Sequence, residues 1–143
     1  MKTTIKRMLA LLLLLSIGMS LFLLPVKAEE PTRSKYYNYV LSTAGVVSGV
    51  LNIHNAYNVL SGTGFTNAEM HTYVERRVLG IFWVKVDNGQ PNKTWLDAST
   101  SRVYSNVFTL TLTQTGTYRV TAEFTFYGSN GSETLTKQST VTY

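Results

Sequence analysis

The segment Thr117-Tyr-Arg-Val-Thr-Ala-Glu-Phe-Thr-Phe-Tyr127 decides the fold class, because its apolar and polar residues alternate without a break. One face of the segment would carry Tyr118, Val120, Ala122, Phe124 and Phe126. The opposite face would carry arginine, threonine, glutamate and tyrosine. Successive side chains of a β-strand point to opposite faces of the sheet, so this pattern predicts a strand with one buried face.

The residues after this segment predict a hairpin with a readable register. Gly128-Ser-Asn-Gly131 is a turn sequence, and residues 132–143 alternate again. A two-residue turn at Asn130-Gly131 would place Leu135 beside Phe126, and a four-residue loop would place it beside Phe124. Both registers bring the apolar faces together, which a slip of one residue would not do.

Residues upstream of the hairpin predict further short strands. Clear alternation covers residues 69–78, 81–86 and 107–112, and Leu79-Gly80 predicts a tight reversal between the first two. The pattern over 46–59 is noisier, residues 36–42 predict an edge strand or an extended arm, and Trp95-Leu96 predicts a short strand in a long connection. No helical period follows Ala28.

These strands predict an all-β domain over residues 36–143. About seven short strands at regular turn spacings favour an antiparallel sandwich of two sheets, with a closed barrel as the alternative. The 115 residues after Ala28 suffice for one domain with one core. Residues 29–35, which begin with two glutamates, are expected to be a flexible N-terminus.

The first 28 residues have the pattern of a secretory signal peptide. A basic start ending at Arg7 precedes an apolar run of 17 residues from Met8 to Leu24. Pro25 ends the expected helix, and Val26-Lys-Ala28 supplies the small residues of a cleavage site. We expect cleavage after Ala28 and a secreted, extracellular protein that meets the membrane only through this leader. An uncleaved anchor is the alternative, because the run is barely long enough to span a bilayer.

Charge and cysteine content exclude several classes of protein. The formal net charge is +5, but residues 29–143 contain 9 basic and 8 acidic residues, so the predicted mature chain is nearly neutral. Electrostatic binding of nucleic acid is therefore not expected. The absence of cysteine excludes disulfides, thiolate metal sites and thiol catalysis. An exported domain without disulfides suits a bacterium with a single membrane.

Three local motifs resemble immunoglobulin-like and fibronectin-III-like sandwiches. Gly116-Thr-Tyr118 resembles a tyrosine corner, in which the tyrosine hydroxyl returns to the backbone. The other two are the strand 118–127 with its glycine turn and polar final strand, and Tyr73-Val-Glu-Arg-Arg77 followed by Phe82-Trp-Val-Lys85. Together they resemble small secreted single-domain proteins of Gram-positive bacteria over residues 69–143. The resemblance implies a fold and carries over no site residues, and the cysteine pair of true immunoglobulin domains is missing.

The sequence contains no recognisable catalytic or metal-binding constellation. His54 and His71 are the only histidines and lie on separate predicted strands. A zinc site needs several converging ligands, and a serine triad needs a positioned base. Asp87 and Asp97 flank a polar loop, but two carboxylates are few for calcium. We therefore expect no catalytic, cofactor-binding or metal-binding residues, and an enzyme ranks third among the functions considered.

Aromatic side chains provide the functional hypothesis. Five are expected on solvent faces or in loops: Tyr57, Tyr73, Trp83, Trp95 and Tyr127. Exposed aromatic rings can stack on sugars or anchor a protein partner. Arg76 falls in the apolar phase of its strand, and we expect an ion pair at the sheet margin, with an acid such as Asp97.

The sequence thus predicts an exported, non-catalytic β-sandwich that acts as a binding module at the cell surface or outside the cell. The expected partner is a protein or a glycan of the cell envelope. The alternative is a secreted toxin or bacteriocin-like effector that acts on the membranes of competitor cells. Near-neutral charge and the absence of an exposed apolar helix weigh against that alternative.

Overall fold

A computed structural model of the protein describes residues 34–143, and all structural statements below concern that part of the chain. The signal peptide expected over residues 1–28 lies outside the described residues. Within them, Ser34 Oγ and the Lys35 backbone N–H both donate to the Glu133 carboxylate, at 3.1 and 2.9 Å. These bonds tie the end of the expected flexible N-terminus to the sandwich.

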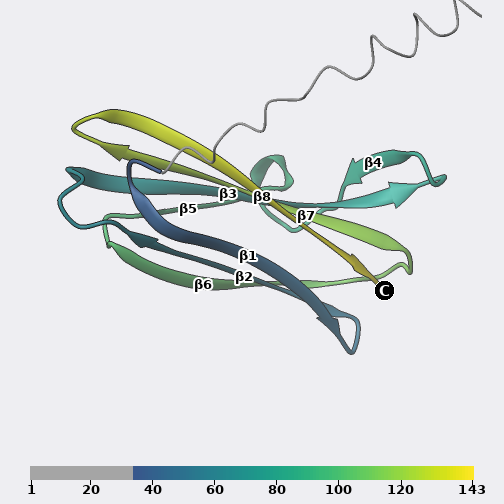
Figure 1. The fold of residues 1–143 in the computed structure, drawn as a ribbon. Coiled ribbons are helices and arrows are strands. Elements are labelled where there is room, and N and C mark those ends of the chain that lie inside the picture. The colour runs from purple at the N-terminus through teal and green to yellow at the C-terminus, as the bar shows by residue number, and fades with distance from the viewer. Residues whose placement is uncertain (1–33) are drawn as a thin grey trace, which may run out of the picture. The chain divides into compact units, whose positions relative to one another are not determined.

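The fold is an all-β sandwich of two antiparallel sheets (Figure 1). The three-stranded sheet has the order β1-β2-β6, from β1 (Tyr37–Val47), β2 (Val50–Val59) and β6 (Val103–Thr111). The five-stranded sheet contains β4 (Phe82–Lys85), β3 (Phe65–Val78), β7 (Thr117–Gly128) and β8 (Gly131–Thr142), in that order, and β5 (Trp95–Ser99) also pairs with β3. A short 3-10 turn, Pro91–Lys93, lies between β4 and β5. The two separate sheets make the fold a sandwich and exclude the closed barrel.

The long strand β3 pairs with three of the other four strands of the five-stranded sheet. One edge of β3 pairs with β7 along most of its length, from Phe65 to Arg76. The other edge is shared, because β5 pairs with residues 68–72 and β4 with residues 75–78. Residues 34–143 contain eight strands, where about seven were expected.

The alternation that predicted β7 is confirmed by its burial. Tyr118 is 2% exposed, and the other four residues of the predicted inner face are fully buried. They join two hydrophobic clusters, one containing Phe124 and Phe126, and one containing Tyr118 and Val120. The alternating strands predicted over residues 69–78 and 107–112 are likewise present as parts of β3 and β6.

The hairpin of β7 and β8 has the second of the two predicted registers. Phe124 pairs with Leu135, and Tyr118 pairs with Val141. Pairing continues to Gly128 and Gly131, so only Ser129 and Asn130 lie between the paired residues. The apolar faces of the two strands therefore coincide, as both registers required.

The tyrosine corner implied by the resemblance is formed. The Tyr118 hydroxyl donates to the backbone carbonyl of Gln114, four residues upstream. If β1–β3 and β6–β8 are taken as strands A, B, C, E, F and G, the sheets are A-B-E and C-F-G, as in immunoglobulin-like sandwiches. The chain differs in that β5 pairs with β3 instead of joining the first sheet.

The noisier pattern over residues 46–59 covers the end of β1, a turn and all of β2. Ser48 and Gly49 form the turn, with φ of 50° and 77°. This turn joins β1 to β2, and Val47 pairs with Val50 across it. Left-handed backbone at both central positions suits the two-residue turns of β-hairpins. The edge strand expected over 36–42 is confirmed as the start of β1, beginning at Tyr37.

Candidate functional site

The hairpin of β3 and β4 extends beyond the rest of its sheet. The last pair between β3 and β7 joins Arg76 to Tyr118, and from Arg77 onward β3 pairs with β4 alone. The chain reverses at Leu79 and Gly80, whose φ angles are 52° and 70°. Figure 1 shows this hairpin diverging from the β1–β2 hairpin toward the same end of the sandwich. Its tip is therefore a two-stranded projection.

Exposed apolar side chains cover the tip of this hairpin. Their exposed fractions are 83% for Leu79, 71% for Ile81, 59% for Phe82 and 50% for Val84. We call these four residues the hairpin tip. The alternation over residues 81–86 puts Phe82, Val84 and Val86 in one phase, but of these three only Val86 packs against the core. The other two are exposed because the hairpin has left the space between the sheets.

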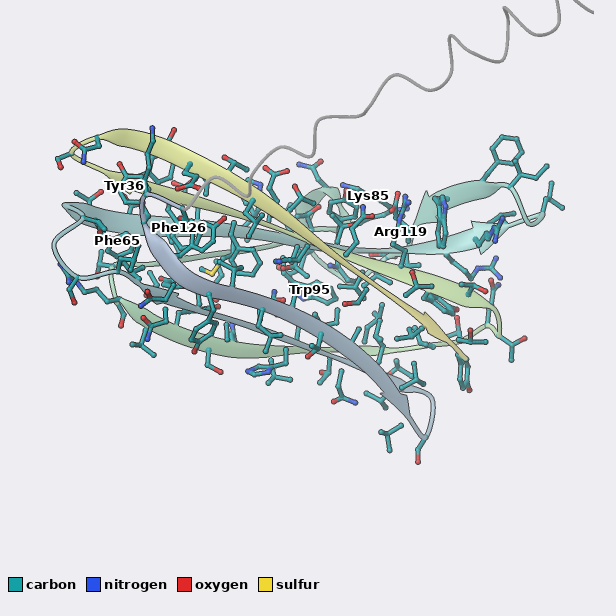
Figure 2. The ribbon with its side chains drawn as sticks, in the orientation of Figure 1. Tyr36, Phe65, Lys85, Trp95, Arg119 and Phe126 are labelled. Carbon is teal, nitrogen blue, oxygen red and sulfur yellow. The ribbon has the colours of Figure 1, made fainter. Side chains whose placement is uncertain are left out.

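Two basic side chains lie against aromatic rings on the outer face of the five-stranded sheet (Figure 2). The Arg119 guanidinium lies 4.4 Å from the centre of the Trp83 ring and forms an ion pair with Glu75 at 2.7 Å. Lys85 Nζ lies 4.2 Å from the centre of the Tyr73 ring. Such cation–π contacts occupy one face of each ring. Two of the five predicted aromatic residues thus lie on the outer face, each covered on one side.

Tyr127 lies on the same sheet but apart from these rings. It pairs with Asn67 across β3, six residues along that strand from Tyr73, which corresponds to about 20 Å. Its hydroxyl donates to Glu69 at 3.1 Å. That hydrogen bond to a carboxylate raises the pKa of Tyr127. Tyr127 does not form one continuous platform with Tyr73 and Trp83.

Tyr57 is a core residue, so the prediction of a solvent position for it was wrong. Its side chain is fully buried, and its ring lies 5.2 Å from both Tyr104 and Phe126 between ring centres. The Tyr57 hydroxyl donates to the backbone carbonyl of Ser101 at 3.0 Å. Burial raises the pKa of Tyr57. The ring fills the core while the hydroxyl has a partner, which suits a large amphipathic side chain.

Trp95 is also largely withdrawn from solvent, contrary to the prediction of an exposed ring. It stacks on Phe108 with ring centres 5.2 Å apart and packs against the core cluster of Val120. Figure 2 shows Trp95 between the two sheets. The residue begins β5, and alternation along that short strand exposes Leu96 instead. The predicted strand at Trp95-Leu96 is confirmed, and its phase places the tryptophan inside.

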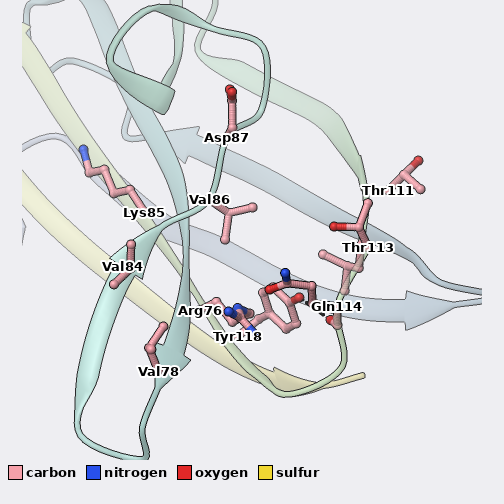
Figure 3. A pocket seen from close by; sticks show the side chains of 11 residues that line it. Arg76, Val78, Val84, Lys85, Val86, Asp87, Thr111, Thr113, Gln114 and Tyr118 are labelled. Carbon is pink, nitrogen blue, oxygen red and sulfur yellow. Dashed lines mark hydrogen bonds between the residues drawn. The ribbon is translucent and has the colours of Figure 1, made fainter.

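Arg76 lines a cleft beneath the hairpin (Figure 3). The cleft has a volume of about 340 Å³. Its apolar walls come from both sides of the opening: Val78, Val84, Val86, Leu112 and Tyr118. Lys85 and Asp87 also border it. Thr111, Thr113 and Gln114 complete the lining, so Arg76 places a cation in a recess of mixed apolar and polar walls next to the hairpin tip.

The expected ion pair between Arg76 and Asp97 is not formed. In residues 34–143 the one ion pair is that of Arg119 and Glu75. Asp97 instead accepts hydrogen bonds from the Tyr104 hydroxyl and, at 2.8 Å, from Asn106 Nδ2. Burial, followed by this bond to Asp97, raises the pKa of Tyr104 well above its ordinary value. Asp97 is therefore satisfied by neutral donors on β6, away from Arg76.

The described residues offer little for metal chemistry. In that part of the chain no three histidine, aspartate or glutamate side chains are grouped closely enough to hold a metal ion. His54 Nε2 is hydrogen-bonded to Ser105 at 2.9 Å, and His71 lies opposite Glu123 on an exposed face. Residues 34–143 also contain no helix that could serve as a membrane span.

Sequence reasoning missed the hairpin tip, although a signal was present. The reversal at Leu79-Gly80 lies inside the run Val78-Leu-Gly-Ile-Phe82, which contains no polar residue. Turns exposed to water are usually built from glycine, proline, asparagine, aspartate or serine. An apolar turn directly after Arg76-Arg77 therefore indicates a contact surface, and the β3–β4 hairpin is the candidate site.

Comparisons of the chain with models of protein families, with curated proteins and with solved structures found no match.

Proposed function

We propose that the protein is an exported, non-catalytic binding module that attaches to a partner at the cell surface or outside the cell through its β3–β4 hairpin. The observation that carries this proposal is the exposure of the hairpin tip. Leu79 and Ile81 leave 83% and 71% of their surface in water on a projecting turn. Contiguous exposed apolar surface on a small domain is typical of an interaction site.

The hairpin is a better contact surface than the predicted aromatic platform. Tyr57 is buried, Trp95 packs between the sheets, and Tyr127 lies apart from the other rings. Tyr73 and Trp83 remain on the outer face, but each already has a cation on one side. These two rings flank the hairpin and can enlarge its contact without forming a separate site.

The chemistry of the tip narrows the class of partner. The sequence suggested a protein or an envelope glycan. Sugars stack on flat aromatic faces, whereas the two most exposed residues of the hairpin tip are the aliphatic Leu79 and Ile81, and Phe82 is its one aromatic residue. An apolar tip gains free energy by leaving water for an apolar environment. The tip therefore favours a partner with apolar surface over a bare glycan.

The same observation supports the alternative of an effector that acts on competitor membranes. Arg76 and Arg77 directly precede the apolar turn, so the hairpin combines basic residues with exposed apolar side chains. Membrane-active surfaces use the same combination. Dye leakage from anionic vesicles separates the two functions. A binding module leaves such vesicles intact at micromolar protein, and an effector releases the dye.

Two matched variants test the proposed function. The hairpin variant carries Leu79→Asn, Ile81→Thr and Phe82→Thr, where asparagine tolerates the left-handed backbone of position 79. The control variant carries Leu96→Thr, Val103→Thr and Val107→Thr, which removes exposed apolar side chains elsewhere. We expect binding to intact cells and isolated envelopes, measured by co-sedimentation, to fall at least tenfold for the hairpin variant only. Equal binding by wild type and hairpin variant, with both folded by circular dichroism, would contradict the proposal.

A further inference from the structure

We infer that the partner of the β3–β4 hairpin is an anionic phospholipid bilayer, into whose interface the hairpin tip inserts while Arg76 and Arg77 bind lipid phosphates. This inference rests on the proposed function, whose contact surface it shares. In the binding-module hypothesis drawn from the sequence, the protein meets the membrane only through its leader. The hairpin would provide a second membrane contact, made by the folded domain.

The spacing of apolar and basic residues along β3 matches the depth profile of a bilayer interface. Leu79 lies at the turn, and Arg76 lies three residues back, which is about 10 Å along a strand. Amphipathic surfaces bury their apolar side about 5–10 Å into the boundary between headgroups and acyl chains. Insertion of the tip to that depth brings both arginines to the level of the phosphates.

The two arginines are placed on opposite sides of the hairpin. Arg76 lines the inner cleft, and Arg77 lies opposite Trp83 on the outer side. Neither takes part in an ion pair within residues 34–143. A guanidinium binds a phosphate through two parallel hydrogen bonds, and arginine is weakly hydrated compared with lysine. The hairpin can therefore contact phosphates from both sides.

The charged groups nearest the hairpin leave it cationic. Glu75 is paired with Arg119, and Lys85 lies over Tyr73 and donates to Thr94 at 3.3 Å. Asp87 borders the cleft that Arg76 lines and offsets one positive charge there. This balance gives charge complementarity with an anionic surface. A neutral bilayer offers only the free energy gained by burying the apolar hairpin tip.

The aromatic residues at the base of the hairpin fit the same environment. Trp83 pairs with Arg77, at the level proposed for the phosphates. Tryptophan and tyrosine are enriched at the boundary between membrane and water, because one end of the side chain is apolar and the other polar. A convex, apolar tip with a basic base suits a flat, deformable surface. A protein partner would need a matching pocket.

Vesicle binding with Trp83 as reporter tests the inference. The full chain and all variants keep residues 1–33, so any contribution of that segment is common to them. We expect phosphatidylglycerol-containing vesicles, but not pure phosphatidylcholine vesicles, to shift Trp83 emission to shorter wavelength and to allow its quenching by brominated lipid. The Trp83→Phe variant should lose this change, because Trp95 stays packed against Phe108.

Charge variants separate the phosphate contact from general attraction. Arg76→Gln with Arg77→Gln should weaken binding to anionic vesicles about 25-fold, at about fivefold per arginine. Lys35→Gln with Arg102→Gln removes the same charge from exposed positions outside the hairpin and should weaken binding less than threefold. Equal losses in the two variants would overturn the phosphate contact.

The outcomes distinguish failure of this inference from failure of the proposed function. Loss of envelope binding in the hairpin variant, without any Trp83 response of the wild type to anionic vesicles, overturns the lipid inference and keeps the binding module. Dimerisation of the wild type that the hairpin variant abolishes also overturns it, because a second copy then covers the tip. Unchanged envelope binding by the hairpin variant overturns the proposed function itself.

Discussion

The Arg119 guanidinium stacks on the Trp83 ring at 4.4 Å and donates two hydrogen bonds to the Glu75 carboxylate, at 2.7 and 2.9 Å. These three residues come from β7, β4 and β3, so one side chain joins three strands of the sheet. β4 has only four residues and pairs with β3 alone. The contact therefore holds the hairpin base in position beneath the exposed tip.

Arg119→Ala should lower the free energy of unfolding by about 1–2 kcal/mol, as the sum of a partly buried ion pair and a cation–π contact. Urea denaturation measures this loss. Trp83 emission should also change in the folded state, because the Arg119 guanidinium no longer lies over the ring. Arg102→Ala is the control, with an expected loss below about 0.5 kcal/mol. Identical denaturation midpoints for the Arg119 variant and wild type would show that the contact does not stabilise the hairpin.

Tyr118→Phe removes the hydroxyl that donates to Gln114 and keeps the buried ring. We expect a loss of about 0.5–1.5 kcal/mol, the usual contribution of one hydrogen bond. Thermal unfolding with matched urea curves measures it. No loss at all would mean that water replaces the bond and that the tyrosine corner contributes nothing to stability.

Asn55 Nδ2 on β2 donates to Thr72 Oγ1 on β3 at 2.7 Å, and because both side chains are fully buried, this hydrogen bond links the two sheets inside the core. Thr72→Val removes the acceptor, so the buried Asn55 Nδ2 group loses its hydrogen-bond partner. We expect a loss of about 1–3 kcal/mol. Combining Thr72→Val with Asn55→Leu should restore part of this stability, because no donor then stays unpaired. A double variant no more stable than Thr72→Val alone would contradict this reading.

Phe124→Ala creates a cavity in the centre of the larger core cluster, where Phe124 is fully buried. The expected loss is about 3–5 kcal/mol. Chemical denaturation checks the value, and Thr125→Ala, on the outer face of the same strand, is the control. An unchanged midpoint would contradict the assignment of the inner face.

The strands with strict alternation could be predicted from the sequence, and those with mixed alternation could not. β7 carries five apolar residues in one phase, and only one assignment satisfies them. The inner face of β2 contains Leu51, Ile53 and Tyr57, but also the buried Asn55, which obscured the pattern. The turn at Ser48-Gly49 was missed because apolar residues flank it on both sides.

The candidate site could be predicted less well than the fold, because exposure depends on where a strand ends relative to its neighbours. Phe82 and Val84 have the correct phase for burial and are exposed only because β7 begins at Thr117, opposite the base of the hairpin. Tyr57 shows the converse, since a tyrosine can be fully buried when its hydroxyl reaches a backbone carbonyl. Alternation determines the face of a sheet, but not what covers that face.

Alkaline pH should destabilise the domain through Tyr104. Its pKa is raised above the ordinary value of 10.0, first by burial and then by the hydrogen bond to Asp97. Below pH 10 both folded and unfolded states keep the proton, so the contribution to stability is fully present. As the pH rises further, the unfolded state ionises first, and the free energy of unfolding falls.

The slope from this one group approaches about 1.4 kcal/mol per pH unit above its ordinary pKa. Urea denaturation at several values between pH 8 and 11 measures the slope, which should be smaller for Tyr104→Phe than for wild type. Parallel curves for the two proteins would show that Tyr104 keeps an ordinary pKa in the folded state.

Amide hydrogen exchange measured residue by residue, with and without anionic vesicles, tests the central claim most directly. Attachment through the β3–β4 hairpin predicts slower exchange over residues 77–85 in the presence of vesicles and unchanged exchange on β1, β6 and β8. Protection that appears on the outer face of β8 or along β6, with the hairpin exchanging as in free protein, would contradict the account.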